Sequence, residues 1–163
     1  MKLKHILFFF GTLLSVPAWS ASEIADLLAS AENNRTSNPT LTQQNLQSIE
    51  ARLAELTPEQ HARYVFISAY SSAFSGKLDK AIVLAESITT TPFVDTRVKA
   101  NLLLANMSES IKDFRKAYSY LYEALKDSHH LKDNAILNNI YTVAAQLHIS
   151  AGAYEKAYEF ART

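Results

Sequence analysis

Four side chains between residues 127 and 133 are of types that bind metal ions, namely Asp127, His129, His130 and Asp133. Imidazole nitrogens and carboxylate oxygens are ligands for zinc and related ions. A metal site also needs fixed geometry, and this polar stretch is typical of a connection between helices, where nothing holds the ligands in place. We therefore expect a solvated loop, and we predict no bound metal and no other cofactor.

Patterns that indicate catalysis are missing from the sequence. There is no nucleophile elbow of the Gly-Xaa-Ser-Xaa-Gly type, no phosphate-binding loop and no isolated pair of carboxylates. There is also no cysteine, which excludes disulfides and thiol chemistry. We predict that this chain is not an enzyme, although a catalytic domain downstream of it stays possible.

Three tyrosines at 118, 120 and 122 form an aromatic cluster. Tyr118 and Tyr122 share one face of a helix because they lie four residues apart. This pair could form a binding stripe, but we favour packing in the core, with Tyr120 pointing elsewhere. We expect His148 to pack against the inner side of its helix as well.

A short turn motif that occurs three times organises the chain. Each copy has a turn residue, a large side chain two positions later, Ala five positions later and Ala seven positions earlier. Small side chains on both helices of a hairpin mark the point where the helices cross closely. These repeat-defining residues are Ala69, Gly76 and Ala81, then Ala105, Lys112 and Ala117, then Ala145, Gly152 and Ala157.

Helical periodicity on both sides of each turn predicts an all-α fold. Thr57, Pro58 and Gln60 make a strong helix start, and Gly76 can adopt the left-handed conformation that ends a helix. No stretch shows the alternation typical of a strand. The expected helices cover 22–33, 40–56, 57–75, 78–88, 93–111, 114–125, 135–150 and the residues from 154 onward.

The repeated turn resembles that of the tetratricopeptide repeat (TPR), whose unit is a helical hairpin of about 34 residues. The spacings here are 36 residues from Gly76 to Lys112 and 40 from Lys112 to Gly152. Lys112 replaces the turn glycine, and the Trp and Leu-Gly residues expected in the first helices are missing. The resemblance implies a TPR-like α-solenoid of about three hairpins, at 57–91, 92–131 and 132–163, after an N-terminal capping helix pair at 21–56. The alternative is an irregular helical bundle. Because the last hairpin is short, we expect the protein to continue beyond it.

The first helices of such an array line a concave groove. The alignment places a mixed set of amide, aromatic and charged side chains there, suited to an extended peptide whose backbone needs hydrogen-bond partners. The alternative is an ordinary solvated surface. The predicted groove residues are Arg63, Phe66, Tyr70, Phe74, Lys99, Leu102, Asn106, Glu109, Asn139, Thr142 and Gln146.

The first 20 residues resemble a secretory signal peptide. Lys2 and Lys4 precede an apolar run over 6–16, and small residues at Ala18 and Ser20 favour cleavage between Ser20 and Ala21. The run is shorter than the roughly 20 residues of a membrane helix, although an uncleaved anchor is the alternative. We expect an exported, periplasmic protein with no membrane span in the rest of this chain. Since 16 basic residues balance 16 acidic ones, we expect no nucleic-acid partner.

A more specific resemblance rests on the order of several features. These are the polar loop 35–39, the segment 53–56, Pro-Glu-Gln at 58–60, the pair Tyr64 and Tyr70, and the corner from Gly76 to Ile82. The order is similar to the extracytoplasmic N-terminal region of bacterial TPR-containing diguanylate cyclases of the GGDEF family. It implies a sensory or protein-binding input region, with the cyclase outside this chain. The alternatives are a stand-alone exported adaptor in envelope assembly and, more weakly, an envelope enzyme with its catalytic domain downstream.

Overall fold

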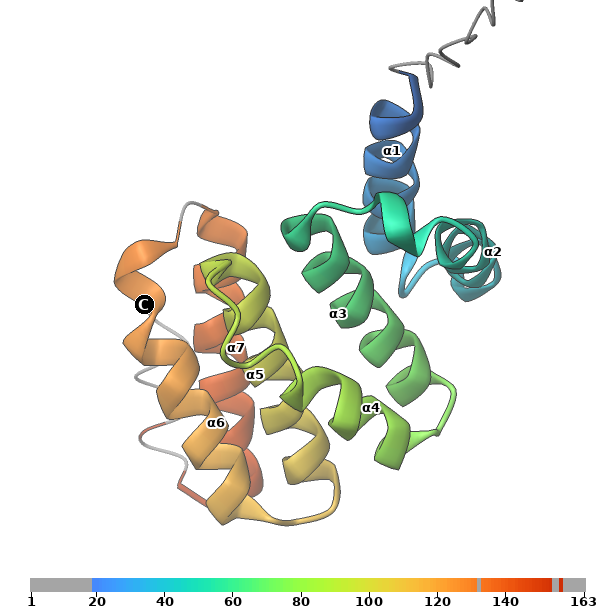
Figure 1. Ribbon diagram of the computed structural model, residues 1–163. Helices are drawn as coiled ribbons and strands as arrows, with labels where there is room; N and C mark the ends of the chain where they lie inside the picture. Colours follow the sequence, from blue (N-terminus) through green and yellow to red (C-terminus); the bar gives the residue numbers. More distant parts are fainter. Residues whose placement is uncertain (1–18, 132, 154–155, 157–163) are drawn as a thin grey trace, which may run out of the picture.

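The computed structural model describes residues 19–131, 133–153 and 156, and in these residues every regular element is helical (Figure 1). The prediction of an all-α protein is therefore confirmed. Two single-turn 3-10 helices, η1 (Leu53–Glu55) and η2 (Ser128–His130), lie in the connections. The α-helices are α1 (Trp19–Asn34), α2 (Pro39–Glu50), α3 (Pro58–Phe74), α4 (Leu78–Glu86), α5 (Val94–Ser110), α6 (Phe114–Lys126) and α7 (Asn134–Ser150).

Two expectations at the ends of the chain fall mostly outside the described residues. The signal peptide was expected over 1–20, of which only Trp19 and Ser20 are described, and the return helix was expected from residue 154. Helix α1 begins at Trp19 rather than at Ser22. Within the part of the chain that the structure describes, no helix is both long enough and apolar enough to cross a bilayer.

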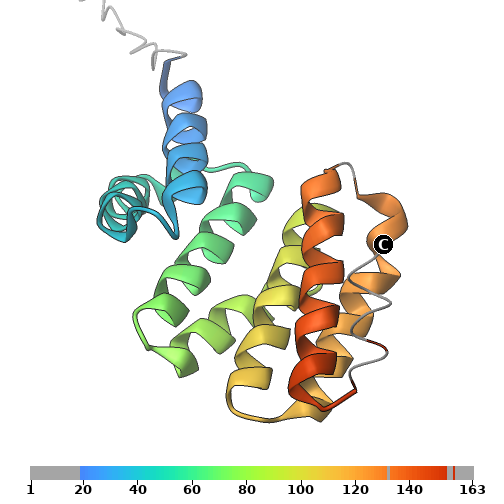
Figure 2. The same ribbon diagram turned by 180° about the vertical axis from the view of Figure 1, so that it is seen from behind.

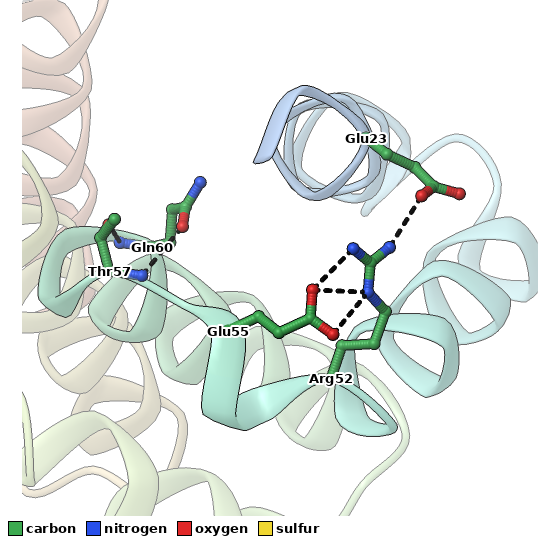
Figure 3. A network of polar contacts seen from close by, with 5 residues as sticks. All are labelled: Glu23, Arg52, Glu55, Thr57 and Gln60. Carbon is green, nitrogen blue, oxygen red and sulfur yellow. Dashed lines mark hydrogen bonds and ion pairs between the residues drawn. The ribbon is translucent and has the colours of Figure 1, made fainter. Parts of the chain in front are cut away.

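Polar contacts lie around the connection between α2 and α3 (Figure 3). Arg52 contacts Glu23 of α1 through Nη1 at 2.8 Å and Glu55 of η1 through Nη2 at 2.8 Å. The Thr57 hydroxyl accepts from the Gln60 backbone N–H at 3.2 Å, and the Gln60 side chain accepts from the Thr57 N–H at 2.9 Å. This is the predicted capping box, and it satisfies two amides that the start of α3 would otherwise leave unpaired.

The three aligned turn residues share one backbone conformation. Gly76, Lys112 and Gly152 have φ angles of 75°, 62° and 78°. The hydrogen bonds at the three helix ends are also the same. The N–H of the turn residue donates to the carbonyl three residues back, and the N–H of the next residue donates to the carbonyl five residues before it. These are Schellman motifs, and they cap the last carbonyls of α3, α5 and α7.

Consecutive helices pack in pairs, α1 on α2, α3 on α4 and α5 on α6. In addition α3, α5 and α7 lie side by side, as Figure 2 shows. The crossing residues Ala69, Ala81, Ala105 and Ala117 are at most 1% exposed, so the paired helices approach closely there. Ala145 is half-buried, and Ala157 lies outside the described residues.

Helix α5 joins two hydrophobic clusters. Leu104 belongs to the cluster that spans α1 to α5, and Leu102 belongs to the cluster that spans α5, α6 and α7. Buried positions cover most of the circumference of α5, which explains why its sequence lacks a clear polar face. The central place of α5 fixes the spacing of its neighbours α3 and α7.

The conformation of Lys112 yields a stability test. A left-handed backbone costs a residue with a Cβ about 1–2 kcal/mol. Lys112→Gly removes this cost. It also increases the entropy of the unfolded chain, which destabilises the folded state by about 0.5–1 kcal/mol. We expect Lys112→Gly to raise the free energy of unfolding in urea by up to about 1 kcal/mol.

Two control variants separate backbone from side-chain effects. Lys112→Ala keeps the Cβ but removes the contact between the Lys112 ammonium and the Phe114 ring, which are 5.8 Å apart, so it should not be stabilising. Gly76→Ala places a Cβ where no heavy atom lies within 4 Å, apart from its chain neighbours. We expect this variant to lose about 1 kcal/mol of unfolding free energy, and that loss reports the backbone strain alone. A Lys112→Gly protein less stable than Lys112→Ala would contradict this account.

Candidate functional site

A pocket of about 490 Å³ opens among α1, α3, α5 and α7. Six of the predicted groove residues line it together, namely Phe66, Tyr70, Lys99, Leu102, Asn106 and Asn139. We call this pocket the groove pocket. Its position follows from the fold, because α5 packs against both α3 and α7.

The other predicted groove residues do not line the pocket. Arg63 lies beside it in an ion pair, and Phe74 is 58% exposed near the end of α3. Glu109 accepts a hydrogen bond from the Ser150 hydroxyl. Thr142 and Gln146 are exposed on α7. The groove pocket therefore uses only part of the predicted surface.

Helix α1 and the residues after it contribute three groups that the sequence analysis did not place in the groove. These are Glu32, Asn33 and Arg35. The stretch 21–56 was interpreted as a cap, so no repeat alignment pointed to these residues. Nothing local in the sequence marks Glu32 as different from other helix-end carboxylates.

Glu32 holds together three helices at the edge of the groove pocket. Its carboxylate contacts Arg63 of α3 at 2.9 Å and Lys99 of α5 at 2.5 Å, and only 13% of its side chain is exposed. Burial opposes ionisation of Glu32, but the hydrogen bonds and charges of Lys99 and Arg63 outweigh it. The pKa of Glu32 is therefore lower than its ordinary value.

Two aromatic rings of α3 line the groove pocket. The ring centroids of Phe66 and Tyr70 are 6.4 Å apart, and Phe66 is 5% exposed. The Arg35 guanidinium lies 5.3 Å from the centroid of Tyr70, and its Nη1 donates to the Glu32 carbonyl at 2.7 Å. A cation over an aromatic face is attracted to the electron density of the ring, so Arg35 is held beside the pocket.

Two exposed carboxamides also line the groove pocket. Asn106 of α5 and Asn139 of α7 are both exposed, and neither side chain hydrogen-bonds to another described residue. Each carboxamide offers two donors and an acceptor. The groove pocket thus combines apolar area with free groups that can pair with a peptide backbone.

The stretch 127–133 differs from the expected solvated loop. Asp127 is paired with Arg97, whose Nε lies 2.6 Å from the carboxylate, and this hydrogen bond lowers the pKa of Asp127. His129 and His130 are exposed in η2. Among the described residues no group of three or more His, Cys, Asp or Glu could hold a metal ion.

Of the tyrosines of α6, Tyr118 packs against a hydrophobic cluster as expected, whereas Tyr122 does not. Tyr122 is 66% exposed, so the expectation that it packs in the core is wrong. Tyr120 instead packs between the two hydrophobic clusters and donates to Glu86 of α4 at 2.9 Å. Burial and the Glu86 carboxylate raise the pKa of Tyr120 to about 12. Tyr118 contacts His148 of α7, with 2.8 Å between the hydroxyl and Nδ1.

The Glu32 network can be tested by its pH dependence. Glu32→Gln leaves Arg63 and Lys99 without their carboxylate, and we expect it to lower the free energy of unfolding by about 1–2 kcal/mol at pH 7. Because the pKa of Glu32 is lower in the folded state, this difference is full above its unfolded pKa of about 4.3. The difference in stability decreases as the pH falls through the lower pKa that Glu32 has in the folded state. Urea unfolding between pH 7 and pH 3 measures the loss of stability at pH 7 and its decrease at lower pH.

Glu23→Gln is the matched control, because Glu23 also lies on α1 and is ion-paired, but its side chain is 66% exposed. We expect it to change the free energy of unfolding by less than about 1 kcal/mol. Equal effects of the two substitutions, or a Glu32→Gln effect that persists unchanged at pH 3, would contradict a structural role for the network.

Comparisons with protein-family models, with curated proteins and with solved structures each gave no match to this chain. The resemblance to TPR proteins therefore rests on the turn motif and its spacing.

Proposed function

We propose that this chain is a non-catalytic, TPR-like sensory or protein-interaction region that binds an extended segment of a partner protein. The observation that carries the proposal is the groove pocket. There, Asn106 and Asn139 bring exposed carboxamides that pair with no other described residue, and Phe66 and Tyr70 bring aromatic rings.

The TPR-like part of the proposal is supported by the corners. Gly76, Lys112 and Gly152 end their helices with the same hydrogen bonds and the same left-handed backbone. In the first two hairpins, the alanines at fixed distances from the corner are buried where the helices cross. Equivalent corners that join equivalent helices are what an array of helical hairpins requires.

The chemistry of the groove pocket suits a peptide better than a small apolar ligand. An extended peptide has a backbone N–H and C=O at each residue, which carboxamides on two neighbouring helices can pair with. Its side chains can contact Phe66, Tyr70 and Leu102. Arg35 and Lys99 are balanced by Glu32 and Asp133 in the lining, so the pocket selects no strongly charged partner.

For the whole protein, we propose the periplasmic input region of a membrane-bound signalling protein of the diguanylate cyclase type. The support is the order of sequence features from the polar loop 35–39 to the corner at Gly76, together with the signal-peptide-like N-terminus. The alternative is a stand-alone exported adaptor in envelope assembly. A membrane span and a GGDEF motif encoded downstream would favour the input region, and a stop soon after a capping helix would favour the adaptor.

Peptide binding can be tested without knowledge of the partner. Peptides would be selected from a random phage-displayed library on the full chain, and their affinities measured by fluorescence anisotropy. Asn106→Ala combined with Asn139→Ala removes hydrogen bonds worth about 1 kcal/mol each. We expect this double variant to bind the selected peptides about tenfold or more weakly.

Thr142→Ala combined with Gln146→Ala is the matched control, because both residues are exposed on α7 and neither lines the groove pocket. This control should keep its peptide affinity within about twofold, and both double variants should unfold at the urea concentration of the parent. The proposal fails if no peptide is enriched, or if the two double variants bind the peptides equally.

A further inference from the structure

Arg35 is a cation of the groove pocket that pairs with no carboxylate of the described residues. Its Nη1 donates to the backbone carbonyl of Glu32 at 2.7 Å, and neither Nε nor Nη2 donates to a described residue. By contrast, Arg52, Arg63 and Arg97 each pair with a carboxylate at 2.6–2.9 Å. Arg35 therefore lacks the counter-ion that these arginines have.

The Nε of Arg35 is buried as well as unpaired. Among the residues that the structure describes, it is the one buried side-chain nitrogen or oxygen without a hydrogen-bond partner. The Tyr70 ring, whose centroid lies 5.3 Å from the guanidinium carbon, attracts the positive charge, but the face of a ring gives Nε no oxygen or nitrogen acceptor. A buried donor without an acceptor is unfavourable, and a bound group that supplies the acceptor removes that cost.

The two carboxylates that line the groove pocket already have other partners. Glu32 binds Lys99 through Oε1 at 2.5 Å and Arg63 through Oε2 at 2.9 Å. The side chain of Asp133 caps α7, where it accepts from a backbone N–H at 2.8 Å. The charges of the whole lining balance, which disfavours a strongly charged partner, but they leave Arg35 able to pair with one carboxylate from outside.

We propose that the partner segment in the groove pocket carries an acidic side chain, Asp or Glu, whose carboxylate binds the edge of Arg35 formed by Nε and Nη2. An arginine can hold a carboxylate through two parallel hydrogen bonds, and Nη1 is already engaged by the Glu32 carbonyl. Nη2 makes the first contact, and a rotation of the guanidinium brings the covered Nε to the second oxygen. The inference rests on the proposed function, because the acidic residue belongs to the same peptide.

The carboxylate is placed on a side chain because the backbone of the segment is engaged elsewhere. In the proposed function the backbone pairs with Asn106 of α5 and Asn139 of α7, whereas Arg35 comes from the segment after α1. A side chain can extend from the backbone to Arg35 while the peptide continues in both directions. The C-terminus of the partner is the other source of a carboxylate, and the test separates the two sources.

The test uses peptides selected on the full chain from a random library displayed at the N-terminus of a phage coat protein, so that no displayed peptide has a free C-terminus. We expect the enriched peptides to share one acidic position. In synthetic peptides with an amidated C-terminus, replacing this carboxylate by the corresponding carboxamide should weaken binding about tenfold. Arg35→Ala should cause a similar loss, and the acidic and carboxamide peptides should then bind equally.

Two further variants control for charge and for the presence of an arginine elsewhere. Arg35→Lys keeps the charge but not the edge with two donors, so it should recover the affinity only in part. Arg115→Ala is the matched control, because Arg115 is exposed on α6 and does not line the groove pocket. This variant should keep the tenfold preference for the acidic peptide.

NMR spectra of the isotope-labelled chain report on Arg35 directly and need no change in its fold. The Nε–H signal of Arg35, identified by its loss in Arg35→Lys, should shift when the acidic peptide is added at saturation and should shift much less with the carboxamide peptide. Urea unfolding of each variant shows whether a change in affinity comes from a loss of the folded state.

The outcomes separate this inference from the proposed function. If peptides bind through Asn106 and Asn139 but share no acidic position, or if the acidic and carboxamide peptides bind the parent equally, the inference is overturned and the proposed function stands. The inference is also overturned if a free C-terminus, and not the side chain, carries the preference. If no peptide is enriched, the proposed function fails and the inference fails with it.

Discussion

The left-handed corner that ends α3, α5 and α7 is the constraint on which the described structure depends. At each corner the turn residue takes a positive φ, and its N–H and that of the next residue donate to two of the last carbonyls of the helix. The chain therefore reverses at once, and the next helix can pack against the previous one through buried alanines, as Ala69 and Ala81 show. Helix α5 packs against both α3 and α7, and the groove pocket is lined by residues of these three helices and of the segment around the end of α1.

Electrostatics attach the N-terminal pair to this arrangement. Glu32 is the carboxylate through which α1 contacts both α3 and α5, by way of Arg63 and Lys99. Burial of a carboxylate is unfavourable by itself, and here two cations from two helices compensate for it. The network stands at the edge of the groove pocket, so the charges that join the helices also help to shape the proposed peptide site.

Periodic features of the sequence were sufficient to predict much of the fold. The positions of the helices follow from apolar spacing, from the capping box at Thr57 and from the aligned corners, including the left-handed Lys112. Contacts between distant residues left no such signal. The pairing of Glu32 with Lys99 spans 67 residues, and that of Asp127 with Arg97 spans 30. The exposed Tyr122 shows the same limit, because a four-residue spacing defines a face but does not say which neighbour covers it.

The central claim is that the groove pocket binds an extended peptide segment. The most direct measurement is site-specific photocrosslinking in the native cell, with a photoreactive residue at Asn139 in the groove pocket or at exposed Tyr122 on α6. The account predicts one discrete crosslinked protein from position 139 and none of that mass from position 122. The same crosslinked product from both positions, or none from position 139, would contradict it.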